Sequence, residues 1–282
     1  MHYVYVMVYI SLAVAMQLLT GNFPVSFFAF PLNLVFAALW LFLLWMLYKE
    51  YSSQASILSI GLLICGCLII GLFPQLSDAE AKMREGLPAF LGCYNFMTSW
   101  IFIAILLFLL SNLAMITIHA YHYRKQARWR FILNHAGLWL ALFAGFLGST
   151  DTQTLRIPIY KGEPSREAFD MNGASHYLDY EIELNSFAVE YYPNGRPSRF
   201  AANVRLGNEK ALLEVNHPYA YRLGEDIYLT GYDVTKGNES EYCILQVVKQ
   251  PWKYIIVAGI LMMLAGAILL FINGPKTDDK LG

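Results

Sequence analysis

The chain has 282 residues, of which 57% are hydrophobic and 15% are charged, and its formal net charge at pH 7 is −1. A soluble domain carries about 25% charged residues, and the mean hydropathy here is +0.42. These values exclude an ordinary soluble enzyme and a disordered chain. The balanced charge offers no basic field for phosphates, so a nucleic-acid binder is also excluded.

The charged residues are concentrated in one region. Of the 41 Lys, Arg, Asp and Glu residues, 25 lie between residues 150 and 250, where 10 basic and 15 acidic side chains give a net charge of −5. The uncharged stretches are 1–48, 51–77, 86–123, 131–150 and 254–275. About 20 apolar residues in a row are enough to cross a bilayer core. We therefore predict a polytopic α-helical membrane protein with one small soluble domain.

We expect six spans, which cover residues 3–20, 31–48, 55–73, 97–119, 131–149 and 253–273. No basic segment precedes the first apolar stretch and no A-x-A site follows it, so we expect a retained span rather than a cleaved signal peptide. The predicted parts are two extra N-terminal spans (1–50), a three-span membrane region (51–149), a β-rich domain (150–250), and a final span with a short tail (251–282).

The basic residues predict the orientation of the chain. Short cytoplasmic loops are enriched in Lys and Arg, and the strongest cluster is Arg124, Lys125, Arg128 and Arg130. Placing this loop in the cytoplasm puts both termini there and puts residues 150–250 outside. Lys49, Lys276 and Lys280 then also lie inside, so the assignments agree.

Residues 150–250 show the pattern of short strands. Apolar and polar residues alternate within 178–192, and the turn sequence Pro193-Asn194-Gly195-Arg196-Pro197 follows. Further strands are expected at 200–206, 210–216, 226–233 and 241–248. We predict a small antiparallel all-β domain, either a sandwich or a barrel.

No catalytic constellation is recognisable. The sequence contains no HExxH, GxSxG, P-loop or GxGxxG motif. Glu181 and Glu183 alternate along one strand and are expected on a solvated face. We therefore expect a non-catalytic protein, with an enzyme of its own as the least supported reading.

The histidine within the fifth predicted span is the strongest functional candidate. An ionisable side chain inside a span is costly and marks a functional site by default. At 100° per residue, Trp139 and Phe146 share the face of His135, and the opposite face carries Gly137, Ala141, Gly145 and Gly148, which favours close helix packing. An imidazole on an apolar, aromatic surface suits axial ligation of haem iron. The alternative is a packing histidine that hydrogen-bonds a neighbour or a lipid headgroup.

Other residues are weaker candidates for a functional site. His119, near the cytoplasmic end of the fourth span, fits an interfacial belt of aromatic and basic residues, or a second haem ligand beside His135. His217 lies in a turn that Asn216 and Pro218 explain. Cys93 and Cys243 are both expected outside, where they would form a disulfide, take part in thiol chemistry, or do neither.

Several segments in order resemble the ResB/CcsB family of system II cytochrome c maturation. The resemblance runs from about residue 57 to 273 and is carried by the following segments: Gly71-Leu72-Phe73-Pro74-Gln75, Ser99-Trp100-Ile101-Phe102, Ser111-Asn112-Leu113, Asn134-His135-Ala136-Gly137-Leu138, Ile159-Tyr160-Lys161-Gly162-Glu163, Phe187-Ala188-Val189-Glu190-Tyr191-Tyr192-Pro193-Asn194-Gly195 and Asn216-His217-Pro218.

The resemblance implies a haem-handling subunit of the bacterial plasma (inner) membrane. With a CcsA-type partner, such a protein carries haem b across the membrane and presents it for attachment to apocytochromes c. The transmembrane histidine of the family corresponds to His135, which would be a haem axial ligand shared with the partner. This chain lacks the tryptophan-rich segment of the partner, so it is expected not to act alone. The alternative function is a membrane scaffold that binds no haem and docks the partner through its β-domain.

The chain also departs from the family pattern. Its two spans before residue 50 are additional, its soluble domain is short, and Met115 and Thr117 stand where many members have a cysteine. The short domain weakens the expectation of a role in docking apocytochromes.

Overall fold

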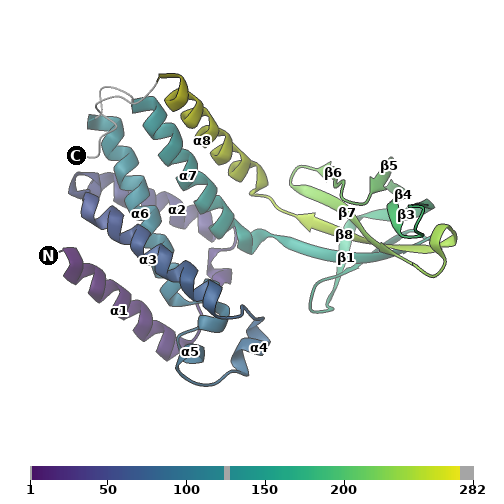
Figure 1. The fold of residues 1–282 in the computed structure, drawn as a ribbon, viewed down its shortest axis with the longest axis horizontal. Coiled ribbons are helices and arrows are strands. Elements are labelled where there is room, and N and C mark those ends of the chain that lie inside the picture. The colour runs from purple at the N-terminus through teal and green to yellow at the C-terminus, as the bar shows by residue number, and fades with distance from the viewer. Residues whose placement is uncertain (1, 124–127, 274–282) are drawn as a thin grey trace. The chain divides into compact units, whose positions relative to one another are not determined.

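The computed structural model describes residues 2–123 and 128–273, which form two compact units. The described residues up to Thr150 and from Ile255 form a helical unit, and residues 151–254 form a sheet unit. Figure 1 shows the helices and strands of the two units in chain order.

Among the described residues, six long helices build the helical unit. They are α1 (His2–Thr20), α2 (Leu32–Leu47), α3 (Ser53–Leu72), α6 (Trp100–Tyr123), α7 (Arg128–Leu147) and α8 (Lys253–Asn273). Among the described residues, the stretches that begin in α2, α3, α6, α7 and α8 are long and apolar enough to cross a membrane, whereas α1 offers the shorter apolar stretch Val4–Thr20. The predicted class, apolar helices joined to an antiparallel β-domain, is confirmed at this level.

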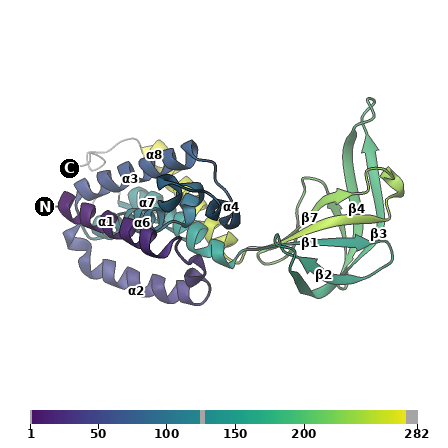
Figure 2. The ribbon, with the colours of Figure 1, turned by 90° about the horizontal axis from the view of Figure 1, so that it is seen from below.

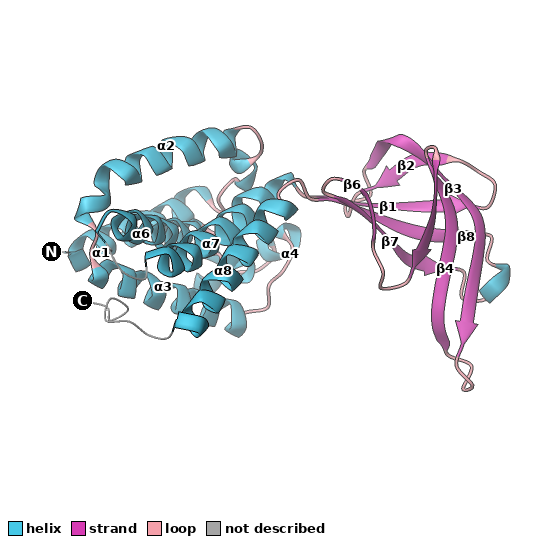
Figure 3. Ribbon diagram, turned by 90° about the horizontal axis from the view of Figure 1, so that it is seen from above, coloured by secondary structure: helices cyan, strands magenta, loops and turns pink. Residues whose placement is uncertain are grey.

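Helix α6 lies at the centre of the helical unit. It contacts α1, α2, α3 and α7, and Figure 3 shows these helices arranged around it. Phe102, Leu106 and Leu110 of α6 are buried and form an apolar cluster with Phe96. The surrounding helices leave many large apolar side chains exposed, which is the surface that a lipid environment would cover.

Short helical segments connect the long helices. They are η1 (Val25–Phe28), η2 (Tyr48–Glu50), α4 (Asp78–Lys82), α5 (Leu87–Phe90), η3 (Cys93–Thr98) and η4 (Gly148–Asp151). The fourth span was predicted to begin at residue 97, but α6 begins at Trp100. Ser99 has an extended backbone, and its Oγ accepts a hydrogen bond from the Phe102 amide at 3.1 Å, so it caps the helix.

The sheet unit is one eight-stranded antiparallel sheet. Its strands are β1 (Gln153–Tyr160), β2 (Ser165–Phe169), β3 (Ser175–Tyr191), β4 (Pro197–Leu206), β5 (Glu209–Glu214), β6 (Tyr219–Arg222), β7 (Glu225–Tyr232) and β8 (Tyr242–Lys249), with a short helix η5 (Gly237–Glu239) before the last. The strand order is β5-β4-β3-β2-β1-β8-β7-β6. Figure 2 shows the sheet from below as a curled surface.

Of the two expected arrangements, a sandwich or a barrel, the single sheet excludes a sandwich of two sheets. Strands β1, β2 and β6 were not predicted, and β1 is the strand that joins the two halves. It pairs with β8 along its full length, from Gln153↔Lys249 to Tyr160↔Tyr242. The curl brings the inward side chains of the sheet together in one core, which includes Ile157, Ile182 and Leu245.

The predicted alternation within β3 is confirmed. Leu178, Tyr180, Ile182 and Leu184 are buried in the sheet core, and the residues between them are less buried or exposed. The turn after β3 is also as predicted, because Gly195 adopts a positive φ of 78° and the Tyr192 amide donates to the Arg196 carbonyl at 2.8 Å. This φ is one that glycine adopts at no steric cost.

Candidate functional site

The structure places His135 in the second turn of α7, with a defined ring orientation. Its Nδ1 lies 3.0 Å from the carbonyl oxygen of Phe131, and its ring stacks on the Phe131 ring with centroids 3.8 Å apart. Because a carbonyl oxygen only accepts, the proton of the neutral imidazole is on Nδ1. The lone pair is then on Nε2, which is the nitrogen able to bind a metal ion.

The half-buried His135 side chain lines an open groove between α7 and α8. The groove has a volume of about 330 Å³, and its lining residues are Asn134, His135, Leu138, Met263, Leu264 and Ala267. Apart from Asn134 and the imidazole, these side chains are apolar. The groove therefore combines one imidazole with an apolar wall.

Glycines set the close approach of the two helices that form this groove. A Cβ on Gly137 would lie 2.6 Å from the Gly259 carbonyl oxygen, and a Cβ on Gly259 would lie 2.7 Å from the Ala141 nitrogen. Further along α8, a Cβ on Gly266 would lie 2.7 Å from the side-chain nitrogen of Asn134. The prediction that small residues of this span pack closely against another helix is confirmed for Gly137 and Ala141. It is wrong for Gly145, which has open space beside it.

Trp139 and Phe146 lie in a different environment from His135. Trp139 packs against the buried cluster around α6 and donates its indole N–H to the Leu110 carbonyl at 3.1 Å. Phe146 packs against the same cluster, with its ring centroid 6.1 Å from that of Phe102. Neither is among the residues that line the groove. These two rings thus help to attach α7 to α6.

His119 is not among the residues that line the groove of His135. The His119 ring contacts Tyr51 and Tyr123, with centroids 5.5 and 4.6 Å away, near the end of α6. This arrangement is the one expected for an interfacial group of aromatic side chains. Within residues 2–123 and 128–273, no cluster of three or more His, Cys, Asp or Glu side chains is placed to hold a metal ion.

The two cysteines expected outside are both free and buried. Cys93 belongs to η3 in the helical unit, and Cys243 belongs to β8 in the core of the sheet unit. Burial raises the pKa of the Cys243 thiol to about 12, so the reactive thiolate is scarce at neutral pH. The structure therefore records neither a disulfide nor an activated thiol at Cys243.

The remaining predicted residues are not among those that line the groove. His217 is exposed in the turn between β5 and β6, where its amide donates to the Glu214 carbonyl at 3.1 Å. In the basic loop, Arg130 is buried at the start of α7. Arg124, Lys125 and the Arg128 side chain lie outside the described residues, as do Lys276 and Lys280.

The contribution of α8 to the groove was not anticipated. Met263, Leu264 and Ala267 come from a helix more than 120 residues further along the chain than His135. The sequence did contain a signal for a packing face on α8. Gly259 and Gly266 are seven residues apart and therefore share one face of the helix. Those two glycines mark the face that packs on α7.

The fold thus combines apolar helices of membrane-spanning length with a small antiparallel sheet unit. The model of the ResB-like family matches residues 124–242, a stretch that contains α7 and the sheet as far as the start of β8. The expected resemblance is confirmed at the level of a ResB-like match over this stretch, which is shorter than the 57–273 expected. The match contains His135.

Among solved structures, one titled "Cytochrome c Heme Lyase CcmF" is similar at 14% sequence identity and a TM-score of 0.38. The similarity covers 74% of this chain and 34% of that protein, so the chain spans about a third of its length. No curated protein matches the chain significantly.

Proposed function

We propose that this protein is a membrane subunit of a system II cytochrome c synthase, and that it binds haem b through His135. The ResB-like match over residues 124–242 suggests a role in cytochrome c biogenesis. The observation that carries the finer proposal is the His135 imidazole, which lies within the matched stretch in an apolar groove. Its Nδ1 is held by the Phe131 carbonyl, so Nε2 is the nitrogen offered to iron.

The residues of the groove fit one side of a haem. When bound, haem would supply an iron that imidazole nitrogens can ligate. His135 offers one nitrogen, and Leu138, Met263 and Leu264 offer apolar surface for a macrocycle. Among the described residues that line the groove there is no second histidine or cysteine. The second imidazole is therefore expected from another protein.

A CcsA-type partner would supply that second ligand and close the open side of the groove. The proposed complex receives haem on the cytoplasmic side and exports it for attachment to apocytochromes c. In this proposal the chain lies in the bacterial plasma membrane with both termini in the cytoplasm, and the sheet unit is extracytoplasmic. The role of this chain is to bind and orient haem, and the attachment chemistry belongs to the complex.

The test is the visible absorption spectrum of the full-length chain purified with a CcsA-type partner. His135→Ala is compared with wild type and with His119→Ala, a matched control at a second membrane-region histidine. We expect the bis-histidine bands to be lost in His135→Ala and kept in His119→Ala, at an equal yield of complex. Added imidazole should restore the bands in His135→Ala, because it fills the vacated axial position.

The scaffold function also has an observation in its favour. The imidazole stacks on Phe131 and contacts its carbonyl, which are contacts that a purely structural histidine makes. If the haem content of His135→Ala equals that of wild type while the yield of complex falls, the scaffold function replaces haem ligation. Unchanged haem and unchanged yield would exclude both roles for His135.

A further inference from the structure

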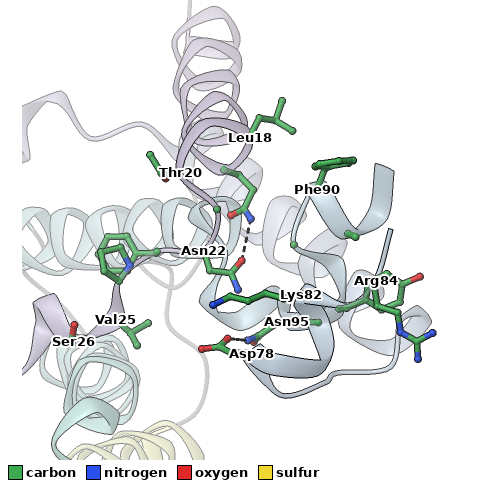
Figure 4. A pocket seen from close by; sticks show the side chains of 18 residues that line it. Leu18, Thr20, Asn22, Val25, Ser26, Asp78, Lys82, Arg84, Phe90 and Asn95 are labelled. Carbon is green, nitrogen blue, oxygen red and sulfur yellow. Dashed lines mark hydrogen bonds between the residues drawn. The ribbon is translucent and has the colours of Figure 1, made fainter. Parts of the chain in front are cut away.

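A cavity in the described part of the chain lies at the other end of the helical unit from His119. Its volume is about 610 Å³, and it is formed where α1 ends, η1 begins and the segment from α4 to η3 folds against them. Figure 4 shows the Lys82 side chain reaching across this cavity toward Asn22. The proposed function makes no use of this region.

A chain of hydrogen bonds fixes which end of the Asn22 amide faces the cavity. The Trp100 backbone N–H donates to Gln17 Oε1 at 2.9 Å, so the Nε2 of Gln17 must point the other way. That Nε2 donates to Asn22 Oδ1 at 3.1 Å. Because Gln17 is buried, at 3% exposure, this arrangement is rigid. The Asn22 amide N–H groups are consequently directed away from Gln17, on the side toward which Lys82 points.

Two kinds of donor therefore face the same space, an ammonium and an amide. Among the described residues, no carboxylate lies within ion-pair distance of the Lys82 ammonium. Asp78, the acid that lines the cavity, accepts a hydrogen bond from Asn95, and Arg84 lies over the Tyr94 ring. Asp78 is an acceptor in the same cavity, but neither the Lys82 ammonium nor the Asn22 amide N–H has a hydrogen-bond partner among the described residues. Two such donors suit an anionic group with several oxygen atoms.

The rim of the cavity is apolar and exposed. Leu18 of α1 and Phe90 of α5 line it, and Phe90 is 66% exposed. Met83 and Leu87 are exposed beside Phe90 on the same segment. Exposed Leu, Met and Phe next to Lys and Arg, at the end of an apolar helix, are typical of a segment at the membrane interface. The ligand should therefore have an anionic head and apolar chains.

We propose that this cavity binds the headgroup of an anionic phospholipid. The phosphate accepts from the Lys82 ammonium and the Asn22 amide, and the acyl chains run along Leu18 and Phe90. Basic pockets between membrane helices are known to bind anionic lipid headgroups. The site would anchor the α4–α5 segment to the bilayer surface.

The test is native mass spectrometry of the full chain in detergent, titrated with phosphatidylglycerol. Lys82→Ala is compared with wild type and with Lys49→Ala, a matched control at another exposed lysine of the helical unit. We expect Lys82→Ala to bind phosphatidylglycerol about tenfold more weakly, which corresponds to about 1.4 kcal/mol, and Lys49→Ala to bind it like wild type. Zwitterionic phosphatidylcholine should bind wild type more weakly than phosphatidylglycerol does.

A second variant tests the polar end of the cavity without removing Gln17's partner. Asn22→Asp keeps an oxygen for the Gln17 amide but replaces the donor by a carboxylate, so we expect a larger loss of binding than in Lys82→Ala. Inorganic phosphate at concentrations equal to the lipid should not displace it. Equal lipid binding by wild type and Lys82→Ala would overturn the proposal, and so would displacement by phosphate alone. Haem content should be unchanged in Lys82→Ala, which separates this site from that of His135.

Discussion

Gly137 and Gly259 face each other where α7 packs on α8, and a Cβ on Gly137 would lie only 2.6 Å from the Gly259 carbonyl oxygen. The backbones are thus in contact at this point. Small residues permit such close approach between membrane helices, where van der Waals packing replaces the hydrophobic effect. The groove that holds His135 exists because this contact fixes the two helices.

Gly137→Ala should destabilise the helical unit. The added methyl group meets backbone rather than a flexible side chain, so the helices must separate, at a cost of about 1–3 kcal/mol. Unfolding of the full chain in mixed micelles measures the effect. Gly145→Ala is the control, because that glycine is in the same helix with nothing within 4 Å, and it should be neutral or stabilising by up to about 1 kcal/mol. Equal behaviour of the two variants would contradict the packing argument.

Gln17→Leu should destabilise the junction between α1 and α6. The Trp100 amide then loses its acceptor in a buried position, which costs about 1–3 kcal/mol. Thermal unfolding of the full chain is the measurement. Gln54→Leu, the same substitution at an exposed position of α3, should leave the melting temperature nearly unchanged. A loss of similar size in both variants would mean that the hydrogen bond to Trp100 is not responsible.

Tyr180→Phe should destabilise the sheet unit. The Tyr180 hydroxyl donates to Glu225 Oε1 at 2.5 Å, and Glu225 is only 6% exposed. Without the hydroxyl, a buried carboxylate loses a donor, and a hydrogen bond to a charged group is worth about 1.5–3 kcal/mol. Hydrogen exchange of β3 and β7 amides reports the loss. Tyr177→Phe, at an exposed tyrosine of the same strand, should exchange like wild type.

The Cys243 thiol should make the sheet unit less stable at alkaline pH. Burial raises its pKa from 9.0 to about 12 in the folded chain. The unfolded chain therefore loses this proton near pH 9, and the folded chain keeps it. The free energy of unfolding is independent of this group below pH 9 and falls by about 1.4 kcal/mol per pH unit above it, until about pH 12.

Comparison with Cys243→Ala shows how much of the fall in unfolding free energy above pH 9 comes from the Cys243 thiol. The variant is less stable at pH 7 because a buried side chain is shortened, but its unfolding free energy should fall less steeply between pH 9 and 12. Circular dichroism of the sheet at increasing denaturant gives both curves. Parallel curves would show that the Cys243 thiol ionises equally in folded and unfolded chains. Thiol-modifying reagents at pH 8 should label Cys243 only after unfolding.

The position of β1 illustrates where sequence patterns are insufficient. It contains Arg156 and Pro158, and a proline argues against a central strand because it lacks an N–H donor. In the structure β1 is nevertheless central. Its bridge to β2 is confined to Arg156↔Phe169, while the β8 side is paired throughout. Pro158 is thus tolerated next to a short ladder, which only the pairing partners reveal.

The sequence by itself determined the apolar helices, the alternating strand β3 and the placement of His135 within a membrane-length helix. These follow from local properties, namely runs without charge and the periodicity of apolar residues. Tertiary structure decided which surfaces these residues face. Trp139 and Phe146 were expected beside His135 but pack against α6, and Met263 and Leu264 from the distant helix α8 line the groove instead. The reason is that the groove depends on contacts between segments over 120 residues apart. The spacing of Gly259 and Gly266 marks a packing face of α8, but no local pattern says which helix packs on it.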